Sequence, residues 1–132
     1  LCAAVEHSSV RDASARLSPV ETLPVDQFGR IDTDGLAAAL DRHRAPRPAL
    51  VHCQWANHEV GTRQPVSEMV SLCREAGVVV HVDAAAACGH LPLELADLDA
   101  DLVSVSAHKF GGPAGAGALI VRSGFRLEPL LV

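Results

Sequence analysis

Lys109 is the residue whose chemical type stands out most in this sequence. It is the single lysine among eleven lysine and arginine residues. A primary amine can form a Schiff base with a carbonyl group and a guanidinium cannot, so this choice of residue favours amine chemistry. The alternative is an ordinary solvated charge in a composition that is rich in arginine.

The residues next to Lys109 could bind a phosphate group. Ser106 and His108 offer hydrogen-bond donors close to it in the chain. The glycine-rich segment 111–115 follows, and glycines let the backbone approach a ligand closely. This neighbourhood therefore favours a ligand that carries both a carbonyl group and a phosphate.

Two residues elsewhere fit the same ligand. Asp83 follows the β-branched run 78–82, and its carboxylate could keep a pyridine nitrogen protonated, which makes the ring an electron sink. His7 could lie flat over that ring. Each has a simpler interpretation, because Asp83 could cap a short helix over 84–87 and His7 could begin a helix. Together with Lys109, they indicate pyridoxal 5'-phosphate.

The elements that must position these residues alternate between strand and helix patterns. Strands are predicted at 1–5, 20–25, 49–55, 78–82, 102–106 and 117–121, and helices at 8–17, around 36–40 and at 65–76 with Gly77 as the stop. The pattern predicts an α/β fold, a three-layer arrangement of a mostly parallel sheet with flanking helices. The link between the last two strands is too short for a helix, so we expect them to be antiparallel or joined by a functional loop.

Polar residues gather where the predicted strands end. They are Glu6 and His7, then Asn57, His58 and Glu59, then Asp83, and finally Ser106, His108 and Lys109. In open α/β sheets, ligands bind beyond the carboxyl ends of the strands. The sequence therefore predicts one site at this edge of the sheet.

Composition limits the partners. The net charge is −5 with neutral histidines, which argues against binding to nucleic acid or anionic membranes. No stretch approaches the roughly 18 apolar residues of a membrane span. The cysteines, Cys2, Cys53, Cys73 and Cys88, form no CxxC pair, so we expect a cytoplasmic protein in a reducing environment.

Four sequence blocks carry a resemblance to a known family. They are VEHSSV at 5–10, WANHEVGT at 55–62, HVDA at 81–84 and SVSAHKFGGPAGAGAL at 104–119. In order and spacing they resemble the cysteine desulfurase and selenocysteine lyase group of class V, fold-type I pyridoxal-phosphate enzymes. The resemblance implies that 1–132 is part of the cofactor-binding large domain. A phosphate loop before it and a C-terminal small domain after it would complete the enzyme.

The resemblance also implies a role for each matching residue. Lys109 would be the internal-aldimine lysine and later the proton shuttle. Asp83 would pair with the pyridine nitrogen, and His7 would stack on the ring and assist proton transfer. Ser106 and His108 would bind the phosphate. No metal site is implied.

Two positions depart from the family's pattern. The family usually has asparagine where this chain has His58, and glutamine where it has Ala86. Both usual side chains lie near the phenolic oxygen of the cofactor. We hypothesise that His58 alone supplies the hydrogen bond there, since a neutral imidazole can donate or accept.

The function implied is a cysteine desulfurase-like lyase. It would remove sulfur from L-cysteine through an external aldimine and pass it to an enzyme cysteine outside this chain, in a homodimer that serves a sulfur-acceptor protein. The alternatives are a class V aminotransferase, a selenocysteine lyase or a scaffold with a decayed site. A zinc site at His52, Cys53 and His58 is disfavoured, because neighbouring residues of a strand point to opposite faces.

Overall fold

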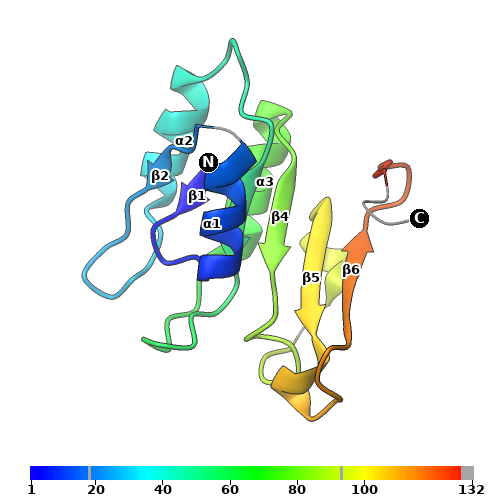
Figure 1. Cartoon of the computed structure of the whole chain (residues 1–132). Helices are drawn as coiled ribbons and strands as arrows, with labels where there is room; N and C mark the ends of the chain where they lie inside the picture. Colours follow the sequence, from blue (N-terminus) through cyan, green and yellow to red (C-terminus); the bar gives the residue numbers. More distant parts are fainter. Residues whose placement is uncertain (18, 93, 129–132) are drawn as a thin grey trace.

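The computed structural model describes residues 1–17, 19–92 and 94–128. Their elements, in chain order, are β1 (Cys2–Ala3), α1 (Ser8–Leu17), β2 (Thr22–Leu23), α2 (Thr33–Arg42), β3 (Val51–Gln54), α3 (Val66–Ala76), β4 (Val80–Asp83), α4 (Leu95–Leu98), β5 (Leu102–Ser106), the 3₁₀ helix η1 (Ala107–Phe110) and β6 (Gly117–Val121). Within these residues the strands form one sheet in the order β2-β1-β3-β4-β5-β6 (Figure 1). The predicted α/β fold is confirmed.

Strands β1 to β5 are parallel, and β6 is antiparallel to β5. The chain leaves β1 through α1 to reach β2 on one side, then returns through α2 to β3 on the other side of β1. Right-handed crossovers in opposite directions put α1 on one face of the sheet and α2 and α3 on the other. Figure 1 shows α1 in front of the sheet.

The core lies between the central strands and α3. Helix α3 turns its buried residues to the sheet at helical spacing: Val66, Met69, Val70 and Cys73. From β3, Val51 and Cys53 point to this face, and the Cys53 Sγ lies 3.1 Å from the Met69 Sδ. The helix ends where Gly77 adopts a left-handed conformation with φ 65°, so the predicted stop is confirmed.

Several predicted boundaries are wrong. Strand β1 covers two residues instead of 1–5, and β2 covers two instead of 20–25, because β2 is the edge strand and pairs with β1 over only two positions. Helix α4 and η1 were not predicted. The short helix over 84–87 is a turn, in which the N–H groups of Ala87 and Cys88 both bond to the Ala84 carbonyl.

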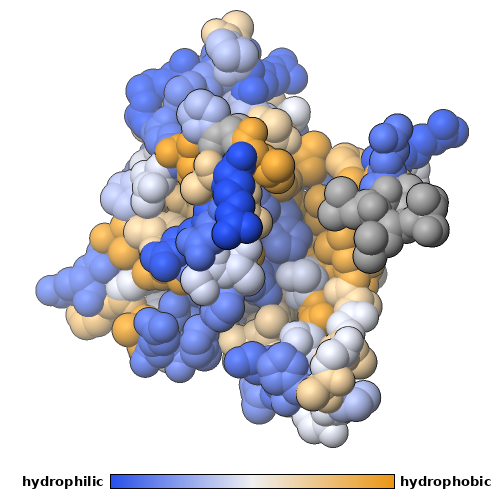
Figure 2. All heavy atoms as spheres, in the orientation of Figure 1, coloured by the Kyte–Doolittle hydropathy of each residue, from blue (hydrophilic) through white to orange (hydrophobic). Residues whose placement is uncertain are grey.

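Strand β6 pairs with β5 on one side and is open on the other within the described residues. Its apolar side chains are exposed: Leu119 keeps 49% of its surface, and Ile120 and Val121 more than a third. Figure 2 shows apolar atoms over β5 and β6, at the right of the molecule. An open apolar edge strand favours pairing with another chain, so the fold as described is prone to association. No described helix is long and apolar enough to cross a membrane.

Candidate functional site

The carboxyl ends of β1, β3, β4 and β5 meet at one edge of the sheet, the lower edge in Figure 1. The connections diverge between β1 and β3, because the one that leaves β1 leads to β2 on one side and the one that leaves β3 leads to β4 on the other side. Such a topological switch point is where open α/β sheets bind ligands. The predicted location of the site at this edge therefore agrees with the strand order.

His7 and His58 lie together beside the switch point. Their ring centroids are 5.8 Å apart with an angle of 47° between the planes. His7 is also the N-cap of α1, because its Nδ1 accepts the N–H of Ser9 at 3.2 Å. That bond places the proton of the neutral ring on Nε2. The simpler interpretation of His7, as a helix-start residue, is therefore confirmed, and the ring remains exposed to a ligand.

The two histidines line a cavity of about 280 Å³ between the end of β1 and the loop after β3. Asn57 joins its two walls, since its Nδ2 donates to the Val5 carbonyl and to the Gln54 Oε1, both at 3.1 Å. Its Oδ1 accepts the N–H groups of Glu59 and Val60. Asn57 thus fixes the loop that carries His58.

Asp83 ends β4 and is 8% exposed. Among the described residues, the hydrogen bonds to the Asp83 carboxylate all go to one oxygen, Oδ1. It accepts the Ala85 N–H at 2.9 Å and the Ser104 hydroxyl at 3.3 Å. The capping interpretation of Asp83 is correct in part, because the carboxylate caps a turn instead of a helix. The second oxygen stays available for a ligand.

Ser106 ends β5, and His108 and Lys109 follow on η1. The Ser106 Oγ lies 3.0 Å from the His108 Nδ1. The turn after β4 holds η1 in place, because the His90 Nε2 bonds to the Lys109 carbonyl at 2.9 Å. Lys109 itself is exposed, so its amine is accessible to solvent and to ligands.

The backbone conformation after Lys109 requires glycine at several positions. Gly111 ends η1 with φ 89°, and Gly115 turns the chain with φ 80°. At Gly112 a Cβ would lie 2.7 Å from the Ala107 Cβ, and at Gly117 it would lie 2.9 Å from the Val105 carbonyl oxygen. The β5–β6 connection therefore needs these glycines whether or not a phosphate approaches them.

The predicted residues fall into two groups with Asp83 on the strand between them. His7 and His58 form one group and Ser106 and His108 the other. Among the described residues, no hydrogen bond or ring contact joins the two groups. The donor set fits pyridoxal phosphate by its chemistry: it offers an amine, a buried carboxylate, imidazoles and a hydroxyl at one sheet edge.

Glu6 and Gln54 are polar residues of this edge to which sequence reasoning assigned no role. Both are 3% exposed. Gln54 lies opposite Asp83 in the β3–β4 pairing, and the Glu6 Oε1 accepts the Gln54 N–H. The signal in the sequence was a charged residue directly after an apolar run, which alone does not distinguish a buried carboxyl from an exposed one.

His52 and His81 form a pair behind the site, on the sheet face that also carries Asp83. Their Nδ1 atoms are 3.0 Å apart, and their rings meet edge to face. Burial, and then the charge of His81, lowers the pKa of His52 to about 4, and burial lowers the pKa of His81. Cys53 points to the opposite face toward Met69, as expected for neighbours on a strand.

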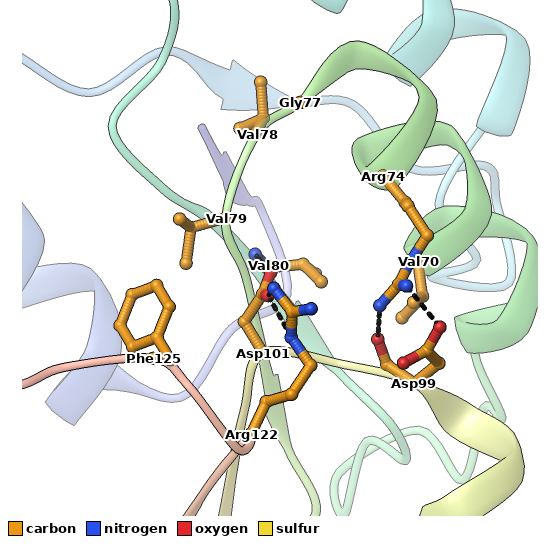
Figure 3. Close-up of a pocket in the computed structure, with 10 residues that line it drawn as sticks. All are labelled: Val70, Arg74, Gly77, Val78, Val79, Val80, Asp99, Asp101, Arg122 and Phe125. Atoms are coloured by element: carbon orange, nitrogen blue, oxygen red, sulfur yellow. Dashed lines mark hydrogen bonds and ion pairs between the residues drawn. The ribbon is translucent and has the colours of Figure 1, made fainter.

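A second hollow, of about 220 Å³, lies at the opposite end of β4 (Figure 3). Its charged residues are already paired: Arg74 with Asp99, and Arg122 with Asp101. Asp101 is 7% exposed and also accepts the buried Val80 N–H at 2.9 Å. These bonds tie β4, β5 and the end of β6 together, so this hollow is structural.

Replacing Asp101 with alanine is expected to lower the free energy of unfolding by about 1–3 kcal/mol, because the Val80 N–H loses its partner inside the protein. The matched control is Asp41→Ala, which removes an exposed carboxylate paired with Arg44 and should cost about 0–1 kcal/mol. Urea unfolding of the intact protein measures both. Equal losses would show that Asp101 is an ordinary surface carboxylate.

Comparisons with known proteins agree with this fold. The aminotransferase class-V family model matches residues 1–132. A cysteine desulfurase of Cereibacter sphaeroides is 42% identical over 132 residues, which cover 96% of this chain and 33% of the relative. The cysteine desulfurase IscS of Methanosarcina thermophila is 36% identical over 99% of this chain and 32% of its own length.

Solved structures share the fold. A NifS-like protein of Rickettsia africae superimposes with a TM-score of 0.89 at 27% identity, over 99% of this chain and 36% of that one. Another NifS-like protein gives a TM-score of 0.88 at 34% identity, over 98% and 36%. The chain belongs to the aminotransferase class-V family, a family of pyridoxal-phosphate-dependent enzymes. It spans about a third of the length of the curated relatives it matches.

Proposed function

We propose that the protein containing this chain is a pyridoxal-phosphate-dependent cysteine desulfurase-like lyase that acts on L-cysteine. The observation that carries the proposal is the lower edge of the sheet, where Lys109, Asp83 and His7 lie at the carboxyl ends of three different strands of a class-V fold. Cysteine desulfurases at 34–42% identity support the same substrate class.

Each predicted site residue of this chain would have its own role in the reaction. Lys109 supplies the amine that holds the cofactor's aldehyde carbon and then moves a proton at the α-carbon of the substrate. Asp83 keeps a proton on the pyridine nitrogen, and His7 covers the ring. Ser106 and His108 donate hydrogen bonds to the phosphate. The bound cofactor supplies an electron sink for the bonds that break at the substrate.

The remaining parts of the proposal concern the whole protein. A cysteine outside this chain takes the sulfur and passes it to an acceptor protein. The protein acts in the cytoplasm as a homodimer. The relatives' names support the sulfur chemistry, and the open edge of β6 is compatible with additional structure beside it.

The visible absorption spectrum of the intact protein with pyridoxal phosphate tests the proposal. We expect a band of the bound cofactor that changes when L-cysteine is added. A band that responds to another amino acid and not to cysteine would redirect the proposal to an aminotransferase or a selenocysteine lyase. A protein without any such band would contradict it and favour the decayed scaffold.

The role of His58 gives a separate prediction. His58→Ala should shift the visible band of the bound cofactor, because we propose that this imidazole supplies the hydrogen bond to the phenolic oxygen. His43→Ala is the control, since His43 binds Glu21 beyond α2 and far from the site in the fold. Identical spectra for the two variants would show that His58 does not contact the cofactor.

A further inference from the structure

Glu6 is the buried carboxyl group in the turn after β1. It is 3% exposed, and its Oε1 accepts the backbone N–H of Gln54 on β3. Its other oxygen, Oε2, is buried without a hydrogen-bond partner among the described residues. The side chain thus links the turn after β1 to β3 through one oxygen and leaves the second unsatisfied, which is unusual for a buried polar atom.

The groups around Glu6 offer it no positive partner among the described residues. On β4, Asp83 is near enough for its negative charge to act on Glu6. On β1 and β3 the thiols of Cys2 and Cys53 are near enough to feel the charge of Glu6, but burial raises the pKa of both, Cys2 to about 11, so neither is a positive partner. On α1, Arg11 lines the same cavity but donates to the Ala4 carbonyl at 3.5 Å. His7 follows Glu6 in the chain and binds Ser9.

An ionised carboxylate in this position would be costly, because charge that is removed from water needs a partner. Burial raises the pKa of Glu6, the hydrogen bond from the Gln54 N–H lowers it and the charge of Asp83 raises it, and together they bring it to about 8. Geometry and charge therefore agree that the group holds a proton at neutral pH.

We propose that Glu6 is a positioning residue: a neutral carboxylic acid that ties the end of β1 to β3 and leaves Asp83 to carry the negative charge at this edge. The bridge fixes the backbone from which His7 projects, at the switch point where Asn57 fixes the loop of His58. When Glu6 is neutral, Asp83 is the carboxylate that carries the charge, and it would pair with the one protonated pyridine nitrogen of the cofactor. This second part rests on the proposed function.

The protonation of Glu6 can be measured without the cofactor. The infrared spectrum of the cofactor-free intact protein at pH 7 should contain the carbonyl band of a protonated carboxyl group, and Glu6→Gln should remove it. Glu75→Gln, which changes an exposed carboxylate of α3, should leave the band in place. A wild-type spectrum without the band would overturn the proposal.

The positioning role is tested by the affinity for pyridoxal phosphate at pH 7. Glu6→Gln is uncharged and keeps an oxygen for the Gln54 N–H, so its dissociation constant should stay within about twofold of wild type. Glu6→Ala leaves that N–H unpaired and should weaken binding about tenfold. If Gln is as harmful as Ala, the residue acts through its charge and the proposal fails. If wild type binds no cofactor, the proposed function fails, and the infrared band alone decides the state of Glu6.

Discussion

Replacing Lys109 with alanine is expected to reduce turnover of L-cysteine by about 10³-fold or more, since the variant lacks the amine that holds the cofactor and moves the proton. The visible band of the bound cofactor should disappear as well. Folding should be almost unaffected, because the side chain is exposed on η1 and surface substitutions usually change stability by about 0.5 kcal/mol or less. Turnover, absorption and thermal unfolding measure the three effects on one preparation.

Lys109→Arg separates amine chemistry from charge. The guanidinium keeps the positive charge but cannot form the Schiff base, so the variant should be as inactive as Lys109→Ala. Arg63→Ala, which removes a cation from another loop, is the control for a general loss of positive charge. Substantial activity in Lys109→Arg would mean that the lysine acts only as a charge.

The stability of the protein should fall as the pH rises from about 4.5 to 8, and Glu6→Gln should remove much of that fall. The pKa of Glu6 is raised from 4.5 to about 8, so between these values the folded state holds a proton that the unfolded state has released. The stabilisation is therefore complete below about 4.5 and is lost as the pH approaches 8. A shift of this size corresponds to about 3–5 kcal/mol.

Urea unfolding of wild type and Glu6→Gln at pH 5, 6, 7 and 8 measures this dependence. The difference between the two proteins isolates Glu6, because His52 and His81 titrate alike in both. Their lowered pKa values act in the opposite direction, since stability from a buried neutral histidine is lost as the pH falls. A difference that is constant across the four pH values would show that Glu6 has an ordinary pKa.

Elements with strong local patterns were predicted well from the sequence. Strands β5 and β6 have the predicted bounds, and α3 differs from 65–76 by one residue, because helical spacing and a terminal glycine specify it locally. The lengths of β1 and β2 could not be predicted in this way. They depend on how far two strands pair at the margin of the sheet, and that is a property of the assembled fold.

In the candidate site, too, some features follow from the local sequence and others depend on the assembled fold. The sequence placed polar residues at strand ends, and parallel pairing then brings those ends to one edge. The burial of Glu6 depends on Gln54, which is 48 residues away and becomes its neighbour only when β1 lies beside β3. The glycines after Lys109 were interpreted as a phosphate approach, whereas the structure shows that the β5–β6 connection also requires them.

The helix cap at His7 affects how genetic data on this site can be read. One imidazole both begins α1 and faces the cavity with His58, so a loss-of-function allele at this position mixes a folding defect with a chemical one. Asparagine is a good N-cap without an aromatic ring, so His7→Asn is a separation-of-function allele. Any phenotype that His7→Ala shows and His7→Asn lacks belongs to the helix and not to the chemistry.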